Sequence, residues 1–246
     1  MTVIRGVLIV ESPCCKKKYA TPRFLSMNFM ASEYWTDGYR HNCLTPNDVG
    51  LRRCICGNYL MLGSLKRIEE LEKAGNFPSL SHVDGDSLIE CIESTKNKSV
   101  EAAARRKYWQ ILNHSYRDVF RKHQEIEEAN TKLKWELDNP DERTLLEKLR
   151  RKKRPVYQRS SDAPFTYPIF EATEQQLTNL EALYVILKSR RRKGDAELAE
   201  LLREQSRFRE ASDEISLIRY EEDDQMLSLI KKLIEKSEAA PMPVFF

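Results

Sequence analysis

Residues 12–15 read Ser-Pro-Cys-Cys and residues 54–57 read Cys-Ile-Cys-Gly, and these two stretches decide how the N-terminal part of the chain folds. Together they contribute four thiols: Cys14, Cys15, Cys54 and Cys56. The pairs are about 40 residues apart, a separation typical of a zinc ribbon, in which turns from two distant hairpins share one tetrahedral ion. We therefore predict that these four cysteines bind one zinc ion that holds structure and performs no chemistry. Gly57 follows the second pair, where a tight turn needs a positive φ.

The spacing within each pair leaves alternatives open. The first two cysteines are adjacent and the second two have one residue between them, whereas a regular ribbon repeats Cys-x-x-Cys. The thiols are then either small buried hydrophobic groups, remnants of a site that lost its ion, or part of a site in which Cys43 or His41 replaces one ligand. Cationic side chains next to both pairs lower thiol pKa values and offset the charge of a zinc tetrathiolate. They are Lys16, Lys17, Lys18, Arg52 and Arg53.

Composition favours long solvated helices for the rest of the chain. Of the 246 residues, 32% are charged and only 8 are glycine, which argues against a β-sandwich or a doubly wound sheet. No apolar run reaches the ~18 residues of a membrane span, and the N-terminus lacks a small-residue cleavage site, so we expect a soluble, cytoplasmic protein. The net charge is +3, with +8 before residue 161 and −5 after it. This asymmetry has two interpretations: the basic N-terminal part binds an anionic partner, or the charges only reflect the solvated outer faces of helices.

The hydrophobic pattern predicts a mainly α protein with a small N-terminal β module. We expect strands at 3–11, 33–36, 51–54 and 59–62, and a helix over 67–73 with Ser64 as its N-cap. An apolar stripe over 100–137, Thr173 and Asp195 indicate further helices. The predicted domains are a zinc-ribbon-like module (1–63), a helical region (64–154), a linker with three prolines (155–170) and a second helical region (171–246).

The order of short motifs resembles a group of uncharacterised bacterial proteins with an N-terminal zinc-ribbon-like module. The motifs that carry the resemblance are Ser12-Pro13-Cys14-Cys15, Tyr34-Trp35-Thr36-Asp37-Gly38, Leu44-Thr45-Pro46, Cys54-Ile55-Cys56-Gly57, Tyr108-Trp109-Gln110-Ile111-Leu112-Asn113 to Arg117, 179–183, 200–204 and 208–211. The resemblance implies a zinc ribbon followed by tetratricopeptide-like helices, and it implies no catalytic residue. Two departures matter: Ser12 stands where the family has its first cysteine, so Cys14 substitutes or a ligand is missing, and the second knuckle is one residue short.

A helical hairpin is predicted near the C-terminus. The segment Ser206-Arg207-Phe208-Arg209-Glu210-Ala211 is similar to the turn between the two helices of a tetratricopeptide repeat, in which a small Ala lets the helices approach closely. Ser206 stands where Gly is usual, and one visible repeat is fewer than the three that a stack needs. A plain antiparallel hairpin of 195–205 with 207–219 fits the pattern almost equally well.

No motif predicts catalysis. The chain has no Gly-rich phosphate loop, no Gly-x-Ser-x-Gly elbow and no His-Glu-x-x-His helix, so we expect a non-enzymatic scaffold that binds another protein. The acidic residues 221–224 suit a basic partner, and the apolar tail 244–246 inserts into a groove of a partner or of a second copy, or folds onto its own body. The alternative is nucleic-acid binding through basic runs. These runs are 16–18, 150–154 and 190–193, with Tyr19, Phe24, Phe29, Tyr34 and Trp35 as stacking candidates.

Overall fold

The computed structural model describes residues 3–26, 31–42, 50–141, 143, 156–158, 167–189, 194–218 and 224–244. The chain forms two compact units, Met1–Asn113 with Glu171–Phe246, and His114–Phe170. Predictions made for Phe29, Cys43, 44–46, 150–154, 190–193, 221–223 and 245–246 lie outside the described residues.

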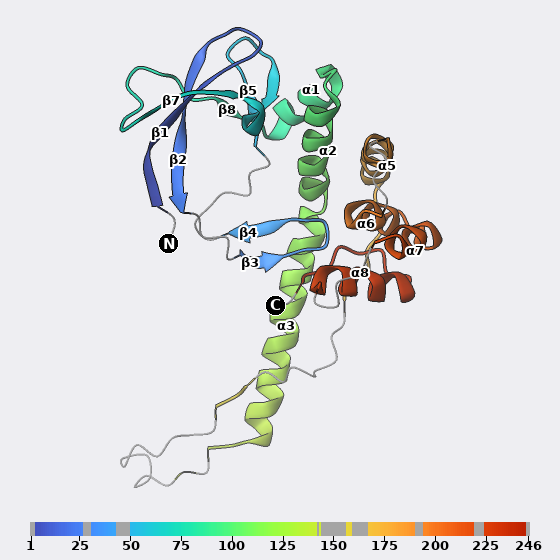
Figure 1. The fold of residues 1–246 in the computed structure, drawn as a ribbon. Coiled ribbons are helices and arrows are strands. Elements are labelled where there is room, and N and C mark those ends of the chain that lie inside the picture. Colours follow the sequence, from blue (N-terminus) through green and yellow to red (C-terminus); the bar gives the residue numbers. More distant parts are fainter. Residues whose placement is uncertain are drawn as a thin grey trace. The chain divides into compact units, whose positions relative to one another are not determined.

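The N-terminal half of the larger unit is built from short antiparallel sheets. In the first sheet, β1 (Val3–Glu11) lies between β2 (Lys18–Ser26) and β7 (Lys66–Leu71), as Figure 1 shows. The remaining strands are β3 (Ala31–Tyr34) paired with β4 (Arg40–Asn42), and β5 (Leu51–Arg53) between β6 (Tyr59–Met61) and β8 (Ser81–His82). A core of buried side chains joins the sheet around β1 to the sheet around β5: Val10, Tyr19, Cys54, Leu60, Leu65 and Leu80. The strands predicted over 3–11, 51–54 and 59–62 are confirmed as β1, β5 and β6, and the one predicted over 33–36 overlaps β3, which ends at Tyr34.

The predicted helix over 67–73 is wrong. These residues belong largely to β7, an edge strand that pairs with β1 in the register Ile9↔Glu69 and Val10↔Arg67. The Glu and Leu residues of this segment favour a helix, but they form a strand because they hydrogen-bond to β1, a segment far away in the sequence. The charged side chains of β7 face outward, which is how natural sheets protect an edge from further pairing. Ser64 lies in a single 3₁₀ turn (Leu62–Ser64), and β structure continues to His82.

Helices form the rest of the larger unit, and their N-caps explain where they begin. The helices are α1 (Gly85–Ser94), α2 (Lys98–Leu112), α5 (Glu174–Lys188), α6 (Ala196–Glu204), α7 (Phe208–Ser216) and α8 (Gln225–Glu235). Thr173 caps α5 in a capping box with Gln176, and Asp195 caps α6, so both predicted starts are confirmed. The core of this part lies between α2, α5 and α6, around Trp109, Leu183 and Leu198.

Helices α6 and α7 form the predicted hairpin. Ser206 adopts a φ of 60° in the turn, the left-handed conformation for which Gly is the usual residue. Ala211 is fully buried against Ala199 and Leu202, and Phe208 packs beside them. The small side chains therefore allow the close approach that the sequence predicted, and the tetratricopeptide likeness stays a prediction.

The C-terminal segment pairs with the strand edge that ends at Trp35. The Val244 N–H donates to the Tyr34 carbonyl at 2.6 Å, the Thr36 N–H donates to the Met242 carbonyl at 2.9 Å, and Pro243 bridges Trp35. Met242 and Val244 are buried. Of the two alternatives for the tail, folding onto its own body is therefore the one that holds at Val244, while 245–246 lie outside the described residues.

The smaller unit contains α3 (His114–Asp138) and extended chain. The Tyr116 ring contacts Phe170 edge-on at 5.2 Å between centroids, and Phe120 stacks with Tyr167 at 6.0 Å. The apolar stripe predicted over 100–137 is helical in both units, with one break at Asn113. Residues 156–158 and 167–170, in the predicted linker, have no helix or strand. None of the helices in the described part of the chain has the length and apolar character that a bilayer crossing requires.

Candidate metal centre and helical cleft

The four predicted cysteines lie together at the ends of two hairpins. The Sγ atoms of Cys14, Cys15, Cys54 and Cys56 are all within 4.8 Å of one another. Cys14 Sγ is 3.2 Å from Cys56 Sγ, and Cys15 Sγ is 3.4 Å from Cys54 Sγ. In a tetrahedral zinc tetrathiolate the sulfurs lie about 3.8 Å apart. The group therefore has the number of donors and the spacing that a tetrahedral metal ion requires.

Backbone hydrogen bonds close the two turns that carry these thiols. Between β1 and β2, the Ser12 N–H donates to the Lys17 carbonyl at 2.9 Å, and Lys16 adopts a φ of 58°. Between β5 and β6, the Cys54 N–H donates to the Asn58 carbonyl at 2.8 Å, and Gly57 has the predicted positive φ, 86°. Because each turn is closed by its own hydrogen bonds, the thiols converge without a long loop.

Ser12 and Tyr19 are part of the site in a way that the sequence did not reveal. Ser12 is fully buried, with its Oγ 2.8 Å from Cys14 Sγ and 3.4 Å from Cys54 Sγ. The Tyr19 hydroxyl is 3.0 Å from Cys54 Sγ and also accepts a hydrogen bond from the Ile55 N–H. Ser12, which the resemblance places where a first cysteine is expected, thus supplies a hydroxyl, and Cys14 supplies the sulfur two residues later.

The electrostatics of the cluster favour thiolate at its centre. Burial opposes the charged form of Cys54, but hydrogen bonds from Ser12 and Tyr19 outweigh it and lower the pKa of this thiol to about 6. Burial, together with the neighbouring thiols, raises the pKa of Cys14 to about 11. Hydrogen bonding by Asn58 and Cys14 lowers the pKa of Cys56. Without a cation the Cys14 thiol therefore keeps its proton beside the Cys54 thiolate, because burial and the neighbouring sulfurs disfavour a second charge there.

Of the two alternative ligands, His41 lies exposed in β4 and does not join this group, and Cys43 lies outside the described residues. The sixth cysteine, Cys91, lies apart from the cluster and is buried in α1, in a core with Leu88 and Val100. Among the described residues, the four cysteines are the only cluster of three or more His, Cys, Asp or Glu side chains placed to hold a metal. The predicted flanking cations divide into the exposed Lys16, Lys17 and Lys18, the buried Arg52, and Arg53, which pairs with Glu90 at 2.8 Å.

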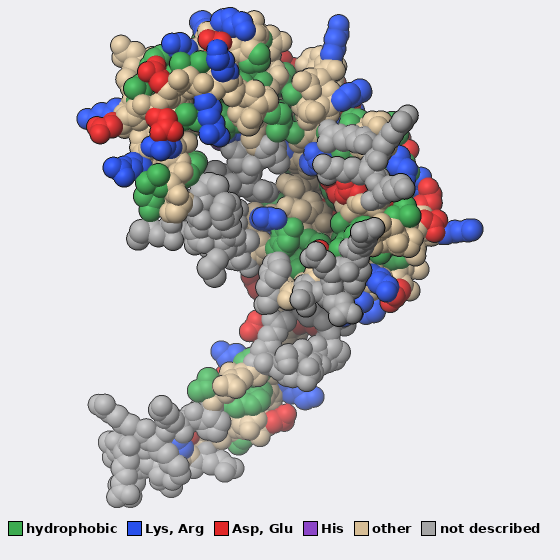
Figure 2. Space-filling view, viewed as in Figure 1, with side chains coloured by type: hydrophobic (Ala, Val, Ile, Leu, Met, Phe, Trp, Pro, Cys, Tyr) green, Lys and Arg blue, Asp and Glu red, His purple; other side chains and the backbone are tan. Residues whose placement is uncertain are grey.

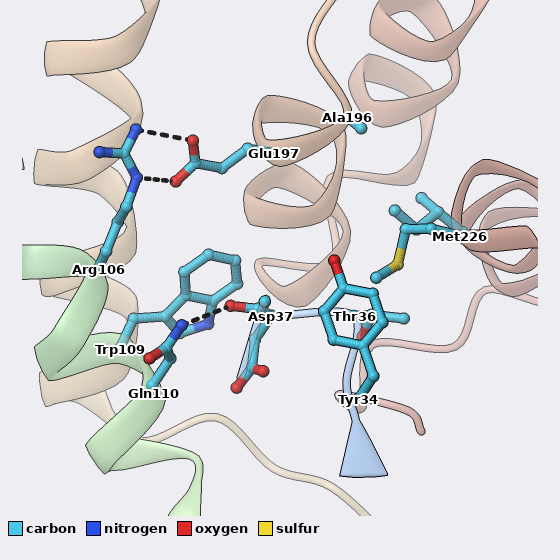
Figure 3. A pocket seen from close by; sticks show the side chains of 11 residues that line it. Tyr34, Thr36, Asp37, Arg106, Trp109, Gln110, Ala196, Glu197 and Met226 are labelled. Atoms are coloured by element: carbon cyan, nitrogen blue, oxygen red, sulfur yellow. Dashed lines mark hydrogen bonds and ion pairs between the residues drawn. The ribbon is translucent and has the colours of Figure 1, made fainter. Parts of the chain in front are cut away.

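A cleft of about 280 Å³ lies between the Trp35–Gly38 turn and helices α2, α6 and α8 (Figure 3). Its walls are formed by Tyr34, Thr36, Asp37, Gly38, Arg106, Trp109, Gln110, Ala196, Glu197, Met226 and Ile230. At one end the Arg106 guanidinium and the Glu197 carboxylate form an ion pair, with Arg106 Nη2 2.8 Å from Glu197 Oε2. Gln110 Nε2 donates to the Asp37 carbonyl at 3.3 Å. The cleft thus combines an apolar wall with a fixed polar end.

A buried polar network holds the Trp35–Gly38 turn against the helices. Asn113 is fully buried, and its Nδ2 donates to Asp37 Oδ2 and to Glu204 Oε2, both at 3.1 Å. Trp109 Nε1 donates to Glu204 Oε2 at 2.7 Å, and Gln176 Nε2 donates to Asn113 Oδ1 at 2.9 Å. Because buried amides and carboxylates are costly when unpaired, each of these side chains requires the others.

A second set of contacts fixes the other side of the same turn. Arg203 is fully buried, and its Nε donates to Glu200 Oε2 at 2.8 Å. It also donates to the Glu238 carbonyl, and its Nη2 lies 3.4 Å from Thr36 Oγ1. The Met242 N–H donates to Thr36 Oγ1 at 3.0 Å. The turn, α6 and the C-terminal segment are therefore hydrogen-bonded through one buried guanidinium.

These networks connect motifs that the resemblance singled out without assigning them a role. Trp35 to Gly38, Trp109 to Asn113, and 200–204 are separated widely in the chain and meet here. No family model matches this chain, and no curated protein or solved structure is significantly similar to it. The resemblance to the bacterial group therefore stays a prediction, and the meeting of its motifs rests on the structure alone.

Glu204 makes the stability of the larger unit depend on pH. Burial, and the charges of Glu200 and Asp37, raise the pKa of this carboxyl well above its ordinary value. A folded-state pKa above the unfolded value means that the native state retains a proton that the unfolded state releases, so stability falls as pH rises through this range. One proton limits the slope to about 1.4 kcal/mol per pH unit. We predict that Glu204→Gln flattens the fall of the free energy of unfolding as the pH rises above 4.5, the ordinary value for this carboxyl, measured by urea denaturation.

The matched control for this change is Glu93→Gln, at an exposed position of α1. It should leave the pH dependence of the wild type in place. A Glu204→Gln variant with a pH profile parallel to that of Glu93→Gln would contradict the assignment of a retained proton to Glu204.

Proposed function

We propose that the chain is a non-enzymatic scaffold in which a structural zinc ion stabilises the β module and the helical body binds another protein. The zinc part is supported by the four sulfur donors within 4.8 Å of one another, since thiolates are the ligands that zinc prefers. Four protein ligands complete tetrahedral coordination and leave no open position for a substrate. A metal bound in this way stabilises the two hairpins.

We predict that protein purified without added metal contains about one zinc per chain, by the four-ligand stoichiometry of such sites. Removing the zinc with a chelator should lower Tm by about 10 °C or more, because metal binding to a structural site contributes directly to the free energy of folding. Cys56→Ser should lose the zinc, as measured by elemental analysis. Cys91→Ser is the control, because Cys91 lies in a separate core, and it should retain the metal.

Metal-free protein with an unchanged Tm would contradict the zinc proposal. A zinc content that is equal in Cys56→Ser and in the wild type would place the metal elsewhere in the chain.

The partner-binding part is supported by the cleft between the Trp35–Gly38 turn and α2, α6 and α8. Among the described residues, its lining includes no His, Cys, Ser or Lys, four side chains that commonly serve as a nucleophile or as its base. The Thr36 hydroxyl is already engaged by Met242 and Arg203. Trp109, Met226 and Ile230 supply an apolar wall, and the Arg106–Glu197 pair supplies a polar edge. This combination fits the apolar side chain of a partner protein, fixed by one or two hydrogen bonds.

The nucleic-acid alternative has less support among the described residues. Tyr19 and Trp35 are each 1% exposed, so these two proposed stacking residues are used in the protein core. Lys16, Lys17 and Lys18 are exposed, while the other two basic runs lie outside the described residues. Binding to phosphates through the first run stays a prediction that rests on charge alone.

The partner proposal predicts that Ala196→Arg abolishes binding. Ala196 lies in the first turn of α6 and lines the cleft, so a long cationic side chain there fills the space without disturbing a hydrogen bond of the network. We expect affinity purification from the native host, with the wild-type chain as bait, to enrich a protein that the Ala196→Arg bait does not. Asp213→Arg, at an exposed position of α7, is the control and should retain that protein.

Enrichment of the same protein by all three baits would place the binding surface outside the cleft. Recovery of the bait alone, together with turnover of a small molecule by the pure chain, would overturn the scaffold proposal.

A further inference from the structure

Helix α3 carries a line of exposed apolar side chains. Val119 is 53% exposed, Ile126 61%, Leu133 58% and Leu137 73%. Their spacing is seven, seven and four residues, so at 3.6 residues per turn they fall within an arc of about 40°. Single exposed apolar residues are ordinary, but a continuous line of four along one helix face marks an interaction surface. Figure 2 shows hydrophobic side chains on the visible surface of this helix.

The chain itself covers a different part of α3, whose ring-bearing residues are turned about 60° (Tyr116 from Val119), 100° (Phe120 from Val119) and 160° (Trp135 from Leu133) around the helix from the line. Tyr116 contacts Phe170, Phe120 stacks with Tyr167, and Trp135 contacts Tyr157 at 6.0 Å between centroids. Among the described residues, the helix therefore packs on its own unit through this part, while the four apolar side chains from Val119 to Leu137 stay more than half exposed. This line is consequently a second apolar face and no part of the core of the unit.

The exposed line continues into a heptad pattern. Val119, Ile126 and Leu133 take one core position of successive heptads, and His123, Asn130 and Leu137 take the other. The resulting alternation of three and four residues averages 3.5, the repeat of a left-handed coiled coil. Asn130 is exposed in the middle of the line. A single Asn in such a position is known to fix the register and the number of strands of a coiled coil.

We propose that α3 pairs with α3 of a second copy of this chain as a short, parallel coiled coil. In the parallel arrangement Asn130 faces Asn130 of the second copy, so both amides find a partner. In an antiparallel arrangement the two kinds of core position meet each other, so Asn130 faces Ile126 or Leu133, which leaves a polar amide against an apolar side chain. The proposal stands apart from the proposed function, because it uses neither the metal site nor the cleft.

The charges beside the line fit a second copy. Lys122 and Glu127 occupy the flanking positions that face each other between parallel helices, so a symmetric dimer contains two Lys122–Glu127 pairs across the interface. The line from Val119 to Leu137 spans 18 residues, or about 27 Å. A seam of this length with a polar layer binds weakly, and we expect a dimer in the micromolar range.

Analytical ultracentrifugation of the full chain tests the proposal. We expect the average mass to rise from monomer to dimer as concentration increases from about 1 μM to 500 μM, the range that brackets a micromolar Kd. Leu133→Glu should weaken association at least about tenfold, because it buries a charge in the seam. Lys132→Glu is the control: this exposed neighbour lies about 100° around the helix from Leu133 and should change Kd less than about threefold.

Two further sets of variants distinguish the proposed coiled coil from non-specific hydrophobic association. Asn130→Ile should strengthen association, since it replaces the polar layer with an apolar one. Lys122→Glu should weaken it, and adding Glu127→Lys should restore it by reversing both pairs. A chain that is monomeric over the whole concentration range would overturn the proposal. The exposed apolar face of α3 would then be a binding surface for a helix of another protein. Equal losses in Leu133→Glu and Lys132→Glu, with helicity unchanged by circular dichroism, would also overturn it.

Discussion

Four sulfur atoms from two turns about 40 residues apart lie within 4.8 Å of one another, and much of the β module depends on this convergence. One turn joins β1 to β2 and the other joins β5 to β6, so the cluster connects two separate sheets. The hydrophobic core beneath it is small, and Cys54 is itself a member of that core with Val10, Tyr19 and Leu60. Small domains of this kind commonly gain stability from a metal because their apolar core is insufficient alone. The hydrogen bonds from Ser12 and Tyr19 prepare Cys54 to be the thiolate around which a metal site forms.

A second set of interactions, a buried hydrogen-bond network, connects the Trp35–Gly38 turn with the helical part of the same unit. Here the contacts are polar and buried, with Asn113 between Asp37 and Glu204, and Arg203 between Glu200 and Thr36. Buried polar networks specify one arrangement strongly, because any displacement leaves a group without its partner. The same network forms one side of the cleft, so the geometry proposed for recognition is fixed before a partner binds. Preorganisation of this kind lowers the entropic cost of association.

Local signals explain which parts of this structure the sequence predicted. The four cysteines are predicted because two close pairs of thiols are typical of a metal site, and the starts of α5 and α6 are predicted from Thr173 and Asp195. The helix predicted over 67–73 was wrong because its residues favour a helix, while β1 decides their conformation. The resemblance leaves open whether Cys14 substitutes at the position of Ser12 or a ligand is missing; the structure places Cys14 in the cluster and also buries the Ser12 hydroxyl among the thiols. Contacts such as that between Thr36 and Met242 join residues 206 positions apart, and no local sequence pattern predicts them.

Absorption spectroscopy of the cobalt-substituted chain tests the central claim most directly. Co²⁺ replaces zinc in tetrahedral thiolate sites, and its spectrum reports both the geometry and the number of sulfur ligands. The account predicts saturation at about one cobalt per chain, by the four-ligand stoichiometry, with intense tetrahedral ligand-field bands and sulfur-to-cobalt charge transfer. Replacing any one of Cys14, Cys15, Cys54 or Cys56 with Ser should change both, whereas Cys91→Ser should leave them unaltered. Weak octahedral bands without charge transfer in the wild-type chain would contradict the claim that these four thiols form a metal centre.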